Sequence, residues 1–127
     1  MEDNSTISEI QEVIQKYLDG IHFGRVEDLQ RAMHPDCRMI SLSEGTYANT
    51  DMATYFQVVA NRQSPHAVGE PREERVLEIS APDDNIATVR LECLVLGKAC
   101  RDTLTLLRMN NNWSIISKVF SFEQRTA

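Results

Sequence analysis

The hydrophobic pattern of this chain changes its period once, and that change most constrains the fold. In most of the chain before Ser64, outside residues 37–50, apolar residues recur at spacings of three and four, the period of an amphipathic helix. After Pro71, apolar and polar residues alternate in four runs separated by turn sequences. The connector of residues 64–71 is too short for a domain boundary, so we expect one domain over residues 1–127 with its core at about 7–122. Helices followed by an antiparallel meander predict an α+β fold, with the helices on one sheet face.

Three helices are predicted before the connector. The first starts at a capping box formed by Thr6 and Glu9 and stops near Gly20. The second covers residues 26–33, because a proline follows shortly after it. The third covers residues 52 to about 62. Its inward-facing residues, again at spacings of three and four, are Met52, Phe56, Val59 and Ala60.

The remaining strands and turns suggest a trial register. A short strand is expected over residues 37–42 and a loop over residues 43–50, with Asp51 capping the third helix. The four later strands cover residues 75–80, 86–96, 99–109 and 113–122. The three turns between them are centred on Asp83, on Gly97-Lys98 and on Asn111. This register places Cys93 opposite Asp102 and Leu104 opposite Lys118.

One face of the resulting sheet is almost entirely apolar. In its middle, Asp102 and Lys118 are the only charges, one diagonal step apart on adjacent strands. Ionised groups are rarely buried unless they are paired, because their desolvation is costly. The pair is either the polar floor of an apolar ligand pocket or a structural ion pair. We expect the pocket, since ligand sites are typically apolar with a few convergent polar groups.

The opposite sheet face is half apolar, which is unusual for a sheet surface left in water. Its apolar members include Leu94, Leu107, Trp113 and Val119. We expect these four residues to form a homodimer interface. The alternative is scattered exposed apolar residues, which are common on monomers.

Composition excludes several classes of partner. The 13 Lys and Arg against 19 Asp and Glu give a net charge of −6, which argues against nucleic acid and anionic membranes. No apolar run approaches the about 18 residues of a membrane span, and the N-terminus lacks the features of a signal peptide. The three cysteines form no CxxC pair, so we expect a reducing, cytoplasmic setting. No metal and no cofactor is expected, because His22 and His66 lack partners at ligand spacing.

Several sequence strings together resemble one known superfamily over about residues 7–122. They are Tyr-Leu-Asp-Gly at 17–20, the segment 29–36 ending in His-Pro-Asp, Arg-Asp-Thr-Leu-Thr-Leu-Leu at 101–107, and Asn-Trp-Ser-Ile-Ile-Ser-Lys-Val-Phe at 112–120. They resemble the nuclear-transport-factor-2-like (cystatin-like) superfamily, and most closely its bacterial putative lumazine-binding group. The resemblance implies a cone, in which a strongly bent antiparallel sheet wraps around three helices, with a deep apolar cavity and usually a dimer.

The superfamily includes ketosteroid isomerase and polyketide cyclases, so enzyme chemistry is an alternative. By motif position, Tyr17 and Asp102 match the tyrosine and the protonated aspartate of the isomerase's oxyanion hole. The position of the general base falls at about Ser41, and a serine does not abstract a carbon-bound proton unaided. An ammonium at Lys118 would also favour ionised Asp102, which then could not donate as a neutral acid. Both departures count against isomerase chemistry, and no catalytic residue is assigned.

The favoured interpretation is a cavity that binds a small, largely apolar or aromatic molecule. Its polar contacts would be Tyr17, Asp102 and Lys118. Its walls and secondary contacts would be Met39, Ser41, Phe56, Cys93, Leu104, Ile116 and Phe120. One alternative is an isomerase, cyclase or dehydratase that uses Asp102 as base and Tyr17 as acid. Another is a dimerisation module whose vestigial cavity is plugged by phenylalanines.

Overall fold

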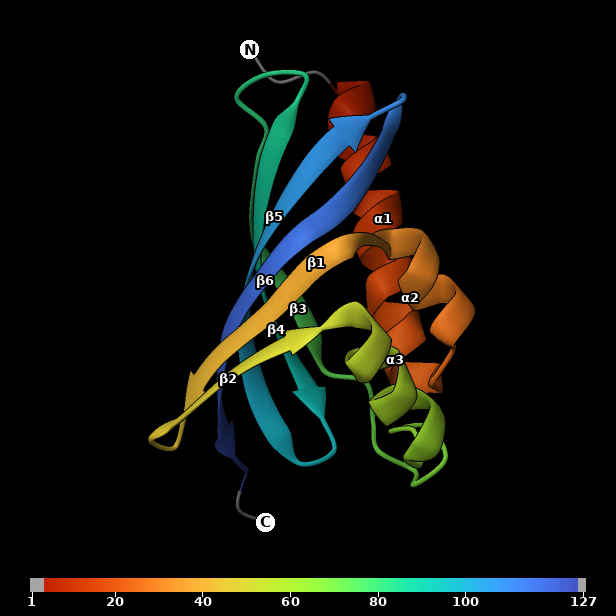
Figure 1. Ribbon diagram of the computed structural model, residues 1–127, viewed down its shortest axis with the longest axis vertical. Helices are drawn as coiled ribbons and strands as arrows, with labels where there is room; N and C mark the ends of the chain where they lie inside the picture. The colour runs from red at the N-terminus through yellow and green to blue at the C-terminus, as the bar shows by residue number, and fades with distance from the viewer. Residues whose placement is uncertain (1–3, 126–127) are drawn as a thin grey trace.

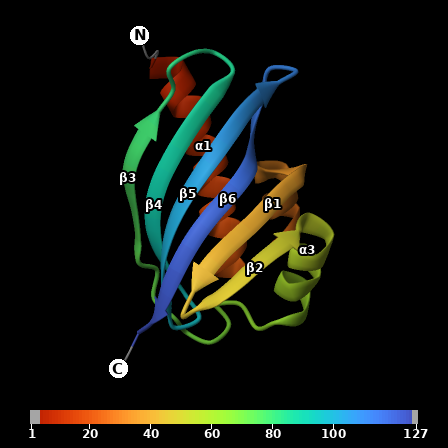
Figure 2. The same ribbon diagram turned by 60° about the vertical axis from the view of Figure 1, so that its left-hand side comes forward.

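The structure, a computed structural model, describes residues 4–125. The elements in chain order are α1 (Asn4–Phe23), α2 (Val26–Ala32), β1 (Met33–Ser43), β2 (Thr46–Asp51), α3 (Met52–Asn61), β3 (Glu74–Ser80), β4 (Ile86–Val95), β5 (Lys98–Met109) and β6 (Asn112–Gln124). They build a single curled, unclosed sheet in the order β2-β1-β6-β5-β4-β3, with the helices on its inner side (Figure 1, Figure 2). The predicted α+β cone is confirmed. None of the helices within residues 4–125 has the length and hydropathy to span a bilayer.

The boundaries of α1 differ from prediction at both ends. The helix already includes Asn4, so Thr6 lies inside it rather than capping it. It also continues past Gly20 and ends at Gly24, whose φ of +67° suits the end of a helix. The role of Gly20 is close packing: a Cβ there would lie 2.7 Å from Cγ of Leu29 on α2. Gly20 therefore lets α2 pack tightly against α1.

The sheet is mixed rather than purely antiparallel. The strand β1 is longer than predicted, and it pairs in parallel with β6, with Met39 beside Lys118. Most of the segment predicted as a loop forms β2, which pairs with β1 around a turn at Glu44 and Gly45. Nearly all of β2 is exposed at the sheet edge. It therefore carries no hydrophobic alternation by which the sequence could reveal it.

The hairpin between β4 and β5 is shifted by two residues from the trial register. Its two turn residues are Leu96 and Gly97, with φ of 51° and 80°, as a two-residue type I′ turn requires. Cys93 therefore lies opposite Cys100, and Leu91 rather than Cys93 lies opposite Asp102. A shift by two leaves every side chain on its predicted face.

The hairpin between β5 and β6 contains a bulge that the sequence prediction missed. Leu104 lies opposite Lys118 as predicted, but the ladder shifts between Thr105 and Leu106 and leaves Ile116 as the extra residue. Beyond the bulge the faces are exchanged. Ile115 and Trp113 are therefore buried, with exposed fractions of 0% and 4%. The prediction of Trp113 as an interface residue was wrong, and Ile116, predicted as an inner wall, is half-buried at the bulge without a partner in the ladder.

Candidate functional site: a polar cluster inside the cone

Three polar side chains meet at the inner surface of the sheet. Tyr17 comes from α1, Asp102 from β5 and Lys118 from β6, and their exposed fractions are 0%, 2% and 6%. The Tyr17 hydroxyl donates to Oδ2 of Asp102 at 2.6 Å. Nζ of Lys118 lies 3.9 Å from the same oxygen. We call these three residues the polar cluster.

Local sequence explains why the three side chains converge. The buried stripe of α1, with Ile10, Ile14, Tyr17 and Ile21, keeps helical spacing and faces the sheet. On the sheet, Asp102 and Lys118 occupy positions of inward parity, so both charges point toward α1. The structure thus brings together the three residues predicted as polar contacts.

The ammonium of Lys118 is surrounded by aromatic rings. Its Nζ lies 4.5 Å from the ring centroid of Phe120, 5.2 Å from that of Tyr17 and 5.8 Å from that of Tyr55. Such rings attract a cation through their quadrupoles. Burial alone would lower the pKa of Lys118, but the Asp102 carboxylate raises it, and the net pKa lies above the ordinary value. The cluster therefore holds Lys118 as a cation.

Tyr17 is held as a hydrogen-bond donor. Burial, and then the negative charge of Asp102, raise the pKa of Tyr17 well above its ordinary value. Because the phenol stays protonated, its hydroxyl donates to the carboxylate. The 3.9 Å from Lys118 to Asp102 is too long for a direct hydrogen bond.

The other oxygen of Asp102 has no partner. Its Oδ1 is buried and makes no hydrogen bond to any group within the described part of the chain. Leaving a buried acceptor unpaired costs about 1–3 kcal/mol, and more for a charged group. This oxygen can accept a hydrogen bond from an N–H or O–H group placed beside it.

Four of the predicted wall residues surround the cluster. Met39 and Leu104 flank Lys118 as its register partners on β1 and β5, and Phe120 is the register partner of Asp102. Ser41 lies beside Phe120, but its hydroxyl shares a 2.9 Å hydrogen bond with Ser43. That engagement leaves Ser41 as a secondary contact at most.

The remaining predicted residues lie farther off. Cys93 lies beside Cys100 instead of Asp102, and Phe56 is half-buried against the core. The α3 residue that reaches the cluster is Tyr55, 5% exposed, which the sequence prediction missed. A stripe of Met52, Tyr55 and Val59 fits helical spacing as well as one through Phe56, so periodicity alone could not choose between the neighbouring aromatics.

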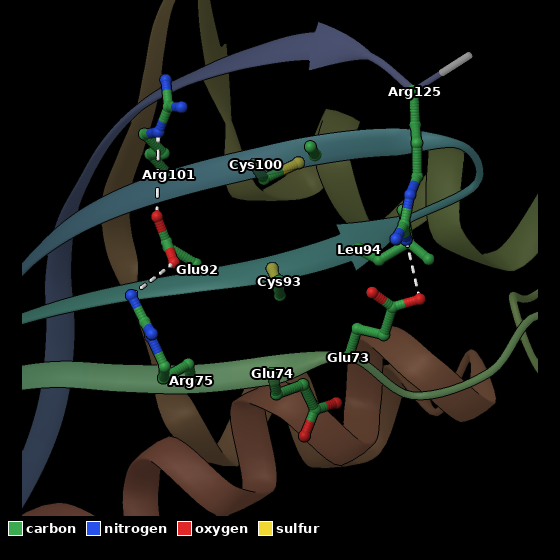
Figure 3. A pocket seen from close by; sticks show the side chains of 10 residues that line it. Glu73, Glu74, Arg75, Glu92, Cys93, Leu94, Cys100, Arg101 and Arg125 are labelled. Carbon is green, nitrogen blue, oxygen red and sulfur yellow. Dashed lines mark hydrogen bonds and ion pairs between the residues drawn. The ribbon is translucent and has the colours of Figure 1, made fainter. Parts of the chain in front are cut away.

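Two cavities of the described molecule lie away from the polar cluster. The larger, of about 520 Å³, is on the sheet where β4 ends and β5 begins (Figure 3). The smaller, of about 320 Å³, lies between α1 and the turn before Trp113. Neither includes a residue of the polar cluster, which is enclosed by packed side chains. A ligand at the cluster therefore has to displace side chains as it enters.

The fold is that of nuclear-transport-factor-2-like proteins. An NTF2-like protein of unknown function from Silicibacter pomeroyi is 18% identical, with a TM-score of 0.85 over 97% of this chain and 100% of that one. One from Shewanella baltica is 17% identical, with a TM-score of 0.85 over 97% and 98%. A ketosteroid isomerase-like protein from Erwinia carotovora atroseptica is 13% identical, with a TM-score of 0.72 over 94% and 98%. These identities establish the fold alone.

A match of the amino-acid sequence to a family model identifies the family of this chain. The model of the family described as "Putative lumazine-binding" matches residues 5–121, and the chain belongs to that family. No protein with a curated description matches it. The resemblance inferred from the sequence strings is thereby confirmed.

Proposed function

We propose that this protein binds a small, largely apolar or aromatic molecule at the polar cluster. The observation that carries the proposal is Oδ1 of Asp102, which is buried and without a partner among the described residues. A donor on the ligand would supply the missing hydrogen bond. Lys118 has N–H donors for a carbonyl or anionic oxygen of the same ligand.

The cluster favours a planar ligand with an N–H beside a C=O. Oδ1 of Asp102 would accept from the N–H, Lys118 would donate to the oxygen, and the ring of Phe120 would pack on the ligand's face. Lumazine, named in the description of the family, carries such an edge and is the first probe to try. Entry would require the half-buried ring of Phe120 to shift so that it packs against the ligand.

Binding is tested by calorimetry with lumazine and a set of aromatic imides and carboxylates. Lys118→Met keeps the apolar stem but removes the ammonium, so affinity should fall at least about tenfold, equivalent to about 1.4 kcal/mol. The matched control is Lys98→Met, which removes a lysine that lies over the ring of Phe122 outside the cluster. Its affinity should equal that of the wild type. The proposal is contradicted if Lys118→Met binds every probe as tightly as the wild type does. It is also contradicted if the wild type binds no probe of the set.

An isomerase, cyclase or dehydratase is the alternative, with Asp102 as base. A general base has to reach the proton it removes. Asp102 is 2% exposed and already accepts from Tyr17, which weighs against this role. A module with a plugged cavity is the other alternative, and the half-buried Phe56 and Phe120 fit it. The calorimetry separates that alternative from the proposal.

We also propose a homodimer through the outer sheet face. Leu42, Tyr47 and Val119 are 66%, 65% and 48% exposed there, and Leu42 and Tyr47 are register partners. We call these three residues the outer patch. We further propose a reducing, cytoplasmic setting, because the three cysteines are an odd number and form no CxxC pair.

A further inference from the structure

Two cysteines outside the polar cluster lie face to face across a hairpin. Cys93 on β4 and Cys100 on β5 are direct register partners, and both are buried free thiols. Their exposed fractions are 6% and 8%. Neither the fold nor the proposed ligand site requires a thiol at these positions.

The geometry of this pair suits a covalent bond. Directly opposed residues of antiparallel strands have Cα atoms about 4.5–5.5 Å apart. Disulfides span Cα distances of about 4.4–6.8 Å. Opposed residues also project to the same face, here the inner face that carries Asp102 two residues after Cys100. The two sulfur atoms are therefore already neighbours in the reduced protein.

The larger cavity borders the strand segments that carry this pair. Both cysteines line it, whereas Cys37, the third cysteine, does not. Figure 3 shows the two cysteines between opposing charged walls. One wall is the ion-pair chain of Arg75, Glu92 and Arg101, with N–O distances of 3.4 and 3.8 Å. The other is the pair of Arg125 and Glu73, at 2.7 Å. A cavity of about 520 Å³ is ample for a small oxidant.

The two thiols differ in reactivity. The neighbouring Cys93 side chain lowers the pKa of Cys100 against the opposing effect of burial, and the positive charges of Lys118 and Lys98 lower it further. The Cys100 side chain and burial raise the pKa of Cys93. Since the thiolate is the nucleophile, Cys100 is the attacking residue and Cys93 the resolving one.

We propose that Cys93 and Cys100 form a reversible disulfide between β4 and β5 when the protein meets a small hydroperoxide. The Cys100 thiolate attacks one peroxide oxygen, the O–O bond breaks, and hydroxide leaves with a sulfenic acid formed on Cys100. Sγ of Cys93 then attacks Sγ of Cys100. The S–O bond breaks, and the sulfenic oxygen leaves as water with the Cys93 proton. The sum is two thiols and hydrogen peroxide giving one disulfide and two waters. A dithiol reverses the reaction by exchange.

The test treats the reduced, full-length protein with hydrogen peroxide and then blocks the remaining thiols with an alkylating reagent. The intact mass should show the loss of two hydrogens and a single alkylated cysteine, and peptide mapping should show Cys93 linked to Cys100. Dithiothreitol should restore three alkylatable thiols. Cys37→Ser is the matched control, and it should form the same link.

The single variants separate the two roles. Cys93→Ser should trap the sulfenic acid on Cys100, detected with dimedone, while Cys100→Ser should lose most of the reaction with peroxide. Peptide mapping of the wild type needs no variant, so the test does not depend on the variants folding. Three alkylatable thiols after peroxide, or a disulfide that involves Cys37 or joins two chains, would overturn the proposal.

Discussion

At the scale of the residue, the burial of Tyr17 beside the Asp102 carboxylate makes stability sensitive to alkaline pH. The pKa values of Tyr17 and Lys118 are both raised above their ordinary values of 10.0 and 10.5. Above those pH values the unfolded chain releases protons that the folded chain still holds. Stability should therefore be full below pH 10.0 and fall as pH rises through the folded pKa values.

Tyr17→Phe tests this coupling. The variant loses a buried hydrogen bond to a charged group, so its free energy of unfolding near neutral pH should fall by about 1.5–3 kcal/mol. Its further loss on going to alkaline pH should be smaller than in the wild type, since one titrating group is gone. Urea unfolding on both sides of pH 10.0 measures both effects. Equal slopes in the wild type and in Tyr17→Phe would contradict the coupling.

How far the polar cluster could be predicted depended on the element from which each residue comes. Strand parity was sufficient for Asp102 and Lys118, because a slip of two residues does not change the face. Helical periodicity was sufficient for Tyr17, which lies in a long stripe. It was insufficient on the short α3, where Tyr55 and Phe56 are adjacent and only tertiary packing decides which is buried.

At the scale of the element, one carboxylate ties the segment before β3 to the turn between β4 and β5. The backbone N–H groups of Leu96 and Gly97, in the turn between β4 and β5, donate to the two oxygens of Glu70 at 2.7 and 2.8 Å. Glu70 belongs to the connector between α3 and β3. A single side chain therefore holds the connector against the turn, a long-range contact that sequence pattern alone did not reveal.

Glu70→Gln replaces one acceptor oxygen with an amide donor that faces a backbone donor. We expect a loss of about 1–3 kcal/mol in the free energy of unfolding, with hydrogen exchange at the Leu96 and Gly97 amides increased. The comparison is Glu78→Gln, which breaks an exposed 3.9 Å pair with Arg90 and should cost less than about 1 kcal/mol. Amide protection at Gly97 that survives in Glu70→Gln would refute this role of the carboxylate.

The hardest element to predict was the bulge in β6. Met109 pairs with Asn112 around the two-residue turn of Asn110 and Asn111, whose φ values are 52° and 64°. The extra residue at Ile116 then restores the pairing of Leu104 with Lys118. The shorter turn shifts the register by one residue, and the bulge shifts it back. The sequence prediction, which assumed a three-residue turn and no bulge, therefore gave the right register at the cluster. The same assumption gave the wrong face for Trp113, because nothing in the local sequence marks the bulge.

At the scale of the whole molecule, the outer sheet face divides into two regions. Over β3, β4 and β5 it carries paired charges, among them Arg75 with Glu92. Over β1, β2 and β6 it carries the outer patch. A stable dimer buries about 800 Å² on each partner, with an apolar centre and a polar rim. The outer patch would form that centre, and the paired charges would form part of the rim.

Leu42→Lys tests the dimer without disturbing the monomer. Leu42 is 66% exposed, so a lysine there costs the isolated fold little, but in a two-fold interface it buries a charge on each partner. Light scattering after gel filtration should give a dimer for the wild type and a monomer for Leu42→Lys, with equal unfolding temperatures when both are diluted to monomers. Val58→Lys, at a 47% exposed position on α3, should remain dimeric. A wild type that is monomeric at high concentration would rule out the dimer. A Leu42→Lys variant that stays dimeric would place the contact elsewhere.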